Sequence, residues 1–579
     1  MPPSFLHMLR LFLLLCCPLL LAAAKPEFTW TLDGNGDVKW HKLTAAGTYL
    51  FGTDSGLYSV DVDSGKYLWK REDLKKVPDF AIEEVPGAPL LFVADDEGKL
   101  MKSTKLYALD IMSGKTIWET DKMQGQVADL FPDYTHNAMV LVATSYTGKA
   151  KLQLLHLDLM TGKANFDLPL EAKVDLYMSE KGSKFSPRMD LNGHAAPTIA
   201  GDALYLAYSG LHKVNLKTGK LEWGATFDVT EKTLKHTNAS PIVAGGLVYS
   251  SAKGVIRAYD DASGQLKWTS ADFGAAIPEM IHDNGTLYGR MGGVFLEPAR
   301  REYQLKKPVG VVALDAAAGS LRWRYEGAKD SITNMHLDKK DGVLLVADAK
   351  NLIGLSLDAS GNKVKESYKI PLEFKFKSSG AKKAAKMAGR FALGGVAGMA
   401  RKDKSDEDHP IALVARTDGN IVVRGKQHLL LFNPQTKQSG WGSAFKAPGM
   451  SNFGKIMTVA AFAMSYGYHT SQAASTYWGT SENRWHNDQR FASMKQFESA
   501  MAKRYSAAAI SDQFAYMLTD VDTSEGDGPG IVGVNLVNGE AERELYFKDR
   551  EPDYVIDEKT GTVIRTHKGK GSIYAQQVR

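Results

Sequence analysis

The stretch "LYALDIMSGKTIW" at residues 106–118 decides the fold. Alternating apolar residues lead to Asp110, a Ser-Gly-Lys turn follows, and Trp118 ends the stretch. Alternation of this kind predicts a strand with one buried face. The Gly of the turn takes a positive φ without a Cβ clash, so the chain can reverse and continue as a partner strand. The stretch therefore predicts a hairpin that carries a large aromatic residue at a fixed place.

This unit recurs along the chain. Its other clear copies are "LYSVDVDSGKYLW" (57–69), "LHLDLMTGKANF" (155–166), "LHKVNLKTGKLEW" (211–223), "IRAYDDASGQLKW" (256–268) and "VVALDAAAGSLRW" (311–323). In all six, an aromatic residue follows the turn Gly after four positions: Trp69, Trp118, Phe166, Trp223, Trp268 and Trp323. A ring of this size buries roughly 150–250 Å², which a lone hairpin cannot cover but a neighbouring copy can. Such repeats predict an all-β propeller of four-stranded blades rather than an ordinary β-sandwich.

Weaker copies follow the clear ones. "IGLSLDASGNKV" (353–364) keeps the turn without the Trp, "LLLFNPQTKQSGW" (429–441) keeps the Trp with a degenerate turn, and "IVGVNLVNGEAER" (531–543) has the turn alone. The C-terminal stretch from Asp553 reads as three short strands, which we expect to pair with N-terminal strands and close the ring. Counting turns predicts seven to nine blades, with eight as the best estimate.

The repeat resembles that of the pyrroloquinoline-quinone-type β-propellers. That family includes quinoprotein alcohol dehydrogenases and the non-enzymatic propeller lipoprotein of the bacterial outer-membrane barrel-assembly machinery. The resemblance implies the fold and leaves the activity open, because one fold can support many functions.

The enzymatic branch of the family implies a quinone site with a Trp platform, a disulfide between adjacent cysteines, Ca²⁺ and an Asp base. The only cysteines here, Cys16 and Cys17, are adjacent but lie in a predicted export signal. The acidic stretch "DVDTSEGDGPG" (520–530) lacks the ligand positions of an EF-hand and is expected to be a solvated loop. These observations favour a non-catalytic protein, with no cofactor and no metal, over a quinoprotein oxidoreductase acting on an alcohol or sugar.

Residues 1–24 have the pattern of a signal peptide. Arg10 precedes the apolar stretch "LFLLLCCPLLL", and three alanines at 22–24 form a small-residue cleavage site. The apolar run is shorter than the ~20 residues that a membrane span requires. We therefore expect an exported protein, periplasmic or extracellular and associated with the envelope, whose propeller spans 25–579. Cleavage and lipidation at Cys16 both stay open as fates of the signal.

A basic, Gly- and Ala-rich insertion is expected at 375–408. Residues 375–402 contain eight Lys or Arg and no acidic residue, although the whole chain has a formal net charge of only +5. The basic excess is thus local, and general binding to nucleic acid is not predicted. Residues 381–402 read as a basic amphipathic helix that could contact an anionic membrane surface, or as a solvated helix or loop.

A helical insertion is expected at 447–510. Two stretches, 454–475 and 490–508, have Ala and Met at helical spacing. The segment between them contains Trp478, Arg484, Trp485 and His486, and Trp and Arg are residue types that are frequent at the energetic centres of interfaces. These four are the candidate partner-binding residues, and a helical hairpin with its own small core is the alternative. The favoured function is therefore an exported scaffold that binds protein partners, with no catalytic residue assigned.

Overall fold

The computed structural model describes most of the chain from Phe28 to the C-terminus. Within 28–579 the described residues exclude 86, 98–102, 147–149, 171–175, 179–186, 190–194, 230–236, 298–301, 359–363, 377–409, 447, 449–487, 492, 512, 550–551 and 568–570. The predicted signal peptide and most of both predicted insertions thus lie outside the described residues.

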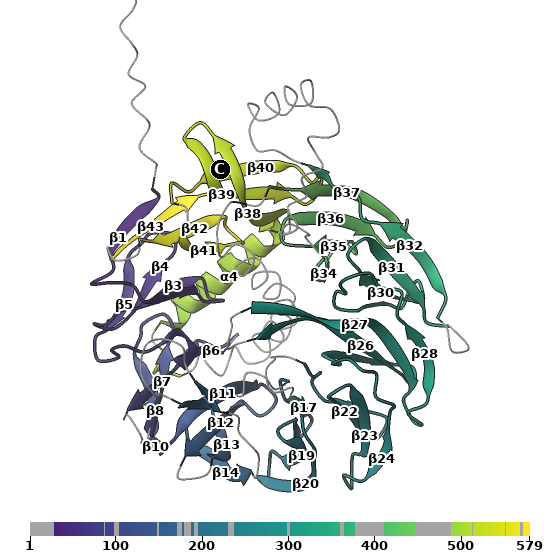
Figure 1. The fold of residues 1–579 in the computed structure, drawn as a ribbon. Coiled ribbons are helices and arrows are strands. Elements are labelled where there is room, and N and C mark those ends of the chain that lie inside the picture. The colour runs from purple at the N-terminus through teal and green to yellow at the C-terminus, as the bar shows by residue number, and fades with distance from the viewer. Residues whose placement is uncertain are drawn as a thin grey trace, which may run out of the picture.

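The described strands form a ring of ten antiparallel blades around a centre (Figure 1). Blades 1 to 5 consist of these strands: β2 (Trp40–Leu43), β3 (Thr48–Gly52), β4 (Leu57–Asp61) and β5 (Tyr67–Arg71); β6 (Ile82–Glu84), β7 (Leu90–Glu97), β8 (Ser103–Asp110) and β9 (Thr116–Glu119); β11 (Gln126–Asp133), β12 (Ala138–Tyr146), β13 (Ala150–Asp158) and β14 (Ala164–Leu170); β17 (Thr198–Ala200), β18 (Ala203–Leu206), β19 (Gly210–Asn215) and β20 (Lys220–Thr226); β21 (Ile242–Ala244), β22 (Leu247–Ala252), β23 (Val255–Asp260) and β24 (Leu266–Thr269).

Blades 6 to 10 complete the ring. They consist of β25 (Glu279–Asp283), β26 (Thr286–Glu297), β27 (Glu302–Asp315) and β28 (Leu321–Tyr325); β29 (His336–Asp338), β30 (Val343–Ala347), β31 (Asn351–Ser356) and β32 (Glu366–Pro371); β34 (Ala412–Ala415), β35 (Ile421–Arg424), β36 (His428–Asn433) and β37 (Gln438–Ala444); β38 (Phe514–Thr523), β39 (Gly526–Asn535) and β40 (Ala541–Tyr546); β41 (Asp553–Asp557), β42 (Thr562–Thr566), β43 (Ser572–Gln577) and β1 (Trp30–Asp33).

The two ends of the chain share blade 10. Strand β1 pairs antiparallel with β43, in a register that places Trp30 opposite Ala575. Strand β1 thereby covers one edge of β43 within the chain. The expected closure of the ring by N- and C-terminal strands is confirmed.

The predicted blade number was wrong. The structure has ten blades, not eight, and lies outside the predicted range of seven to nine. The three weak copies each form a separate blade, and the closing strands form a tenth instead of completing one of the others. Loss of the Trp or of the turn residues does not remove a blade, because apolar contacts on both sides still bury its strands.

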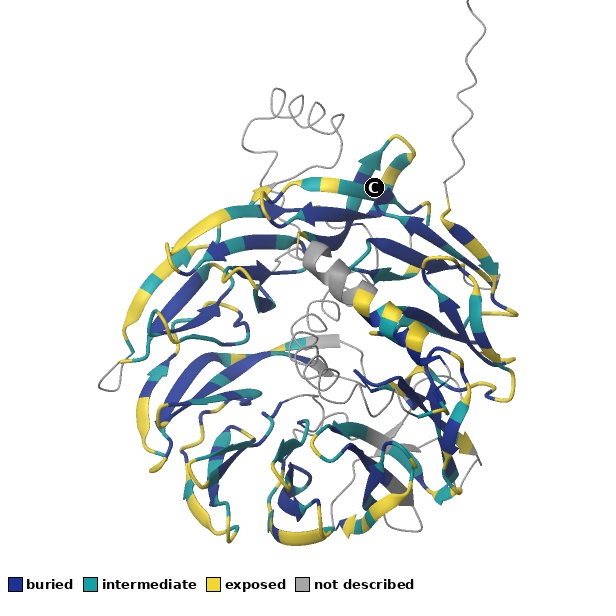
Figure 2. Cartoon of the chain, turned by 180° about the vertical axis from the view of Figure 1, so that it is seen from behind, coloured by how far each residue is buried: buried dark blue, intermediate teal, exposed yellow. Residues whose placement is uncertain are grey.

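The hydrophobic core is divided among the gaps between neighbouring blades, which we call seams. Each cluster of buried apolar residues joins adjacent blades, as Tyr49 of blade 1 and Ile564 of blade 10 do at the closing seam. Such clusters occupy every seam of the ring. Figure 2 shows the buried residues concentrated in the inner strands and the exposed residues along the rim. The ring is therefore held by contacts between neighbours, as expected for a repeat fold.

Several elements are added to the blades. The short strands are β10 (Met123–Gln124), paired with β8; β15 (Leu176–Met178) and β16 (Pro187–Met189), paired with each other; and β33 (Lys375–Phe376), parallel to β37. A 3-10 helix, η1, spans Asp79–Ala81. One α-helix is described, α4 (Met494–Ser511), and it lies across a face of the ring in Figures 1 and 2. The stretch 520–530, expected to be a loop, instead forms the facing ends of β38 and β39.

Candidate functional site: the seams, helix α4 and a pocket beside the closing blade

The six repeat aromatics lie at the seams. Trp69, Trp118, Trp223 and Trp323 are buried, while Phe166 and Trp268 are partly buried. At the five seams where both partners are described, the aromatic ring packs against the turn Gly of the next blade. The contact is so close that a Cβ on that Gly would overlap the aromatic ring. At Gly114 an added Cβ would lie 2.6 Å from Trp69 Cδ2. These turns also require positive φ, which is 67° at Gly114.

The indole N–H adds a polar contact to this packing. Trp69 Nε1 donates to the Ile111 carbonyl at 2.9 Å, and Trp118 Nε1 donates to the Leu159 carbonyl at 2.8 Å. The accepting residue always directly follows the Asp or Asn that begins the turn. The same bond is made by Trp30, Trp223, Trp268 and Trp441. One side chain thus joins two blades by packing and by a hydrogen bond that satisfies a turn carbonyl.

A β-bulge accompanies each of the six repeat aromatics. In blade 1 the register shifts between Ser59 and Val60, so that Ser59 faces Trp69 while Val60 faces Tyr67. The pairing of the last two strands shows the same shift in each of blades 1 to 9. A bulge re-aims the side chains beside it. It places the aromatic on the face that contacts the next blade.

The seam between blades 3 and 4 differs, because its aromatic is Phe166, which has no N–H. Here His136 of blade 3 bridges two carboxylates: its Nδ1 lies 2.8 Å from Asp133 Oδ2 and its Nε2 lies 2.9 Å from Asp202 Oδ1 of blade 4. His156 Nε2 lies 3.0 Å from the same Asp133 oxygen, and its ring stacks on Phe166. An electrostatic bridge therefore crosses the seam at which the indole bond is missing.

The bridging groups have shifted pKa values. Burial lowers the pKa of His136, but the hydrogen bond to Asp202 and the charge of Asp133 outweigh it, and the net shift is upward. Burial raises the pKa of Asp133, yet its hydrogen bonds from His156 and His136 bring it below its usual value. Hydrogen bonds from Lys217 and His136 lower the pKa of Asp202. Each shift favours the charged form, as expected for a mutually paired cluster.

Helix α4 is fixed to the ring at its N-terminal end. Phe491, Met494, Phe497 and Met501 belong to the same buried cluster as the cores of blades 1 to 3. Just before the helix, the Ser493 hydroxyl donates to the buried carboxylate of Asp110, the turn residue of blade 2. A residue of the repeated turn thus anchors an element outside the repeat.

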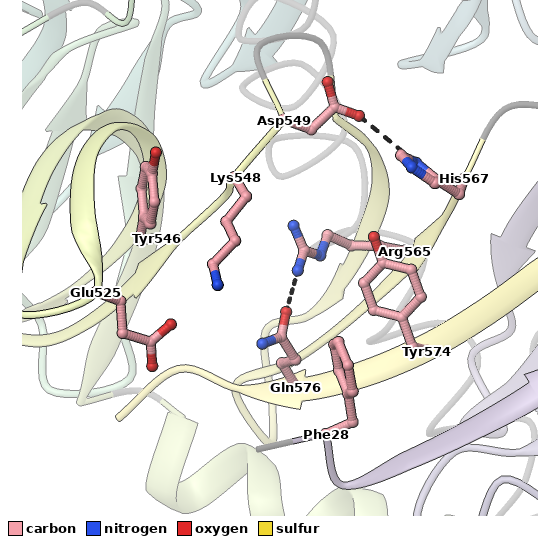
Figure 3. A pocket seen from close by; sticks show the side chains of 9 residues that line it. All are labelled: Phe28, Glu525, Tyr546, Lys548, Asp549, Arg565, His567, Tyr574 and Gln576. Carbon is pink, nitrogen blue, oxygen red and sulfur yellow. Dashed lines mark hydrogen bonds and ion pairs between the residues drawn. The ribbon is translucent and has the colours of Figure 1, made fainter. Parts of the chain in front are cut away.

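A pocket of about 320 Å³ lies beside the closing blade, between blades 9 and 10 (Figure 3). Its lining residues are Phe28, Glu525, Tyr546, Lys548, Asp549, Arg565, His567, Tyr574 and Gln576. The β38–β39 hairpin forms one wall, because a Cβ on Gly526 would lie 2.5 Å from Tyr546 Cε1 and only Gly allows this approach. Strands β42 and β43 supply the opposite wall. Both ends of the chain therefore contribute to one pocket.

Arg565 is the buried charge of this pocket. Its side chain is 6% exposed, and its Cζ lies 4.7 Å from the centroid of the Phe547 ring and 4.8 Å from that of Tyr574. Burial lowers the pKa of its guanidinium, opposed by Tyr574 and by the carboxylates of Asp549 and Glu525. Asp549 Oδ2 lies 3.9 Å from His567 Nδ1. The pocket thus combines aromatic walls with one desolvated cation.

The comparisons with known proteins identify the family. A family model described as outer membrane protein assembly factor BamB matches residues 53–296 and 252–368, which together span more than half of the chain. The chain belongs to this family. The match runs from the second half of blade 1 to the last strand of blade 7 and includes all six clear copies of the repeat. The expected membership in the PQQ-like propeller family is confirmed.

Solved structures show weaker likenesses. BamB from Moraxella catarrhalis aligns over 70% of this chain and 96% of its own, with 12% identity and a TM-score of 0.32. The computationally designed Ika8 protein aligns over 55% and 94%, with 13% identity and a TM-score of 0.27. The dihydro-heme d1 dehydrogenase NirN aligns over 58% and 66%, with 11% identity and a TM-score of 0.33. Scores this low carry no inference about this BamB-family chain. No curated protein matches its sequence.

The predicted partner-binding residues Trp478, Arg484, Trp485 and His486 lie outside the described residues, as do 381–402 of the basic segment and both cysteines. Within the part of the chain that the structure describes, no three His, Cys, Asp or Glu side chains are grouped so that they could hold a metal ion. The same part contains no helix with the length and apolar content of a membrane span.

Three features of this BamB-family propeller were missed by sequence reasoning. The bridge at His136 joins residues 66 positions apart, and the Ser493–Asp110 bond joins residues 383 apart, so neither has a local signature. The pocket residues come from both ends of the chain. One signal was available: Phe166 is the single Phe among the six repeat aromatics, which marks its seam as different.

Proposed function

We propose that this BamB-family chain is an exported, non-catalytic scaffold that binds protein partners during assembly of the cell envelope. The observation that carries the proposal is the match of blades 1 to 7 to a family described as an outer membrane assembly factor. The positively charged start and apolar stretch of residues 1–24 support export.

The chemistry of the repeat agrees with a scaffold. The aromatic residues of the clear repeats hold neighbouring blades by packing on the turn Gly and, where the residue is Trp69 or Trp118, by donation to a turn carbonyl. A rigid ring built in this way leaves its rim and its insertions for binding. We infer that Trp478, Arg484, Trp485 and His486 contact the partner, because Trp and Arg are among the residue types that contribute most to interface energies and His486 adjoins Trp485.

Site-specific photo-crosslinking tests this proposal. A photo-reactive amino acid replaces Trp478 or Trp485 in the full-length protein, produced in its native source. The matched control carries the same group in place of Leu266, which is 53% exposed on the outer strand β24. We expect both insertion positions, and not the rim position, to crosslink to one defined envelope protein. Equal labelling from all three positions, or none, would contradict the assigned surface.

A second experiment separates the scaffold from an oxidoreductase. The purified mature protein is mixed with pyrroloquinoline quinone and Ca²⁺, and both the quinone absorbance and dye-linked oxidation of alcohols and sugars are measured. We expect neither stoichiometric uptake nor turnover. Saturable uptake with turnover would overturn the non-catalytic assignment.

We further propose that residues 381–402 contact the membrane surface, because eight basic and no acidic residues lie within 375–402. Co-sedimentation with vesicles containing anionic lipid tests this, using the full chain and a chain that lacks 381–402. Loss of binding on deletion is expected. Equal sedimentation of the two chains, or equal binding to neutral vesicles, would refute a charge-driven contact.

A further inference from the structure

The pocket between blades 9 and 10 has an aromatic entrance. Phe28, just before β1, is 38% exposed although it is a large apolar residue. Its ring lies 4.8 Å from that of Tyr574, in an edge-to-face arrangement. Tyr546 stands on the opposite wall, under the turn of the β38–β39 hairpin (Figure 3). An exposed aromatic beside two others forms a surface suited to a planar apolar group.

The floor of the pocket carries hydrogen-bond donors that the described residues do not use. Arg565 donates from Nη2 to the Gln576 side-chain oxygen, and its buried Nε has no partner. A guanidinium offers five N–H donors, and a buried donor without an acceptor is costly. The side chain lines the pocket, so an acceptor inside the pocket can use terminal N–H groups that the bond to Gln576 leaves over, while the buried Nε stays out of its reach.

The remaining charges of the pocket lie nearer to solvent. Lys548 is exposed, and in Figure 3 it extends toward the same space as Arg565. Glu525 is exposed on the hairpin across the pocket, and Asp549 faces His567. Solvent screens exposed charges far more than buried ones. The desolvated guanidinium therefore dominates what the pocket attracts, which is an anion.

We propose that this pocket binds a carboxylate attached to an aromatic or similarly apolar group. A guanidinium has the planar N–H geometry that recognises carboxylates. The apolar group would lie against Phe28 and Tyr574, and Lys548 would meet the outer oxygen. A volume of about 320 Å³ is large enough for one amino-acid residue. The inference is independent of the proposed scaffold function.

Isothermal titration calorimetry of the full-length protein tests this site with three probes. They are N-acetyl-L-phenylalanine, its amide, and a pentapeptide that ends in Phe with a free carboxylate. We expect the free acid to bind at least tenfold more tightly than the amide, since charged hydrogen bonds supply about this factor. Tighter binding of the pentapeptide would assign the site to a chain terminus, and equal binding would assign it to a small acid.

Variants of the lining residues test whether the acid binds in this pocket. Arg565→Gln should weaken binding of the acid at least tenfold and leave the amide unchanged. Its matched control is Arg257→Gln, because Arg257 also lies over an aromatic ring, that of Phe227 at 4.7 Å, and has a buried nitrogen without a partner, but is not among the residues that line this pocket. Should Arg565→Gln fail to fold, the exposed Lys548→Gln and Phe28→Ala are expected to weaken binding several-fold. Equal affinity for acid and amide, no binding of the acid at millimolar concentration, or an unchanged affinity in these variants would overturn the proposal.

Discussion

The seams between blades 1 and 2 and between blades 3 and 4 have the same geometry but different chemistry. At the first, Trp69 packs on Gly114 and its indole donates to the Ile111 carbonyl. At the second, Phe166 packs on Gly219 in the same way but has no donor. There, His136 bridges Asp133 and Asp202 instead. Packing on the turn Gly is therefore common to both seams, whereas the polar link between the blades differs.

The largest expected effect on stability comes from removing the aromatic ring at a seam. Trp69→Ala empties a site that is 6% exposed and should lower the free energy of unfolding by about 3–5 kcal/mol. Phe166→Ala removes a smaller, partly buried ring and should cost about half as much. Urea unfolding, with hydrogen exchange of blades 1 to 4, measures both. A larger loss of unfolding free energy for Phe166→Ala than for Trp69→Ala would show that packing on the turn Gly does not stabilise the two seams in the same way.

The second effect isolates the contact between ring and glycine. Gly114→Ala should destabilise by about 2–4 kcal/mol, because it combines an unfavourable positive φ with overlap on Trp69. Gly245→Ala is the matched control: its φ is also positive, at 59°, but a Cβ there would have no neighbour within 4 Å. Its cost should be about 1 kcal/mol. Equal losses of unfolding free energy in the two variants would mean that the positive φ, and not the overlap with the Trp69 ring, is the reason why the turn requires Gly.

The third effect depends on pH. The pKa of His136 is raised in the folded protein, so its contribution is complete below its unfolded value of about 6.5 and is lost as the pH rises through the folded value. Those of Asp133 and Asp202 are lowered, so their contributions are complete above about 3.9 and are lost on acidification. His156 and Lys217 face the same carboxylates. The bridge is therefore strongest at mildly acidic pH.

His136→Ala should thus cost about 1 kcal/mol at about pH 5.5 and clearly less at about pH 9. Urea unfolding of the variant and of the unaltered chain at both pH values gives the difference. Trp69→Phe, which removes an indole donor and changes no titrating group, serves as the control and should show the same loss at both pH values. If the loss of unfolding free energy caused by His136→Ala does not change with pH, the charged form of His136 does not stabilise this seam.

The sequence predicts the parts of this fold that repeat locally. Alternation, the turn Gly and the aromatic four residues later are all contained within about thirteen residues, so the propeller and its closure could be predicted. The best estimate of eight was too low because blades 7 to 9 are weak copies, in which burial by both neighbours replaces the pattern. Ten lies beyond the predicted range because the closing strands form a blade of their own. The bulge before each aromatic, the bridge at His136 and the pocket at Arg565 arise from pairing across strands and seams. Composition and spacing do not encode these contacts.

The smallest expected effect tests whether the two polar links are interchangeable. Phe166→Trp would place an N–H near the turn of blade 4 and should stabilise the seam by at most about 1 kcal/mol. If the new bond replaces part of the bridge, the loss caused by His136→Ala should be smaller in the Phe166→Trp background by about 0.5 kcal/mol or more. A double-mutant cycle at about pH 5.5 measures this coupling. Strict additivity would show that the indole bond and the histidine bridge stabilise different parts of the seam, so that one has not substituted for the other.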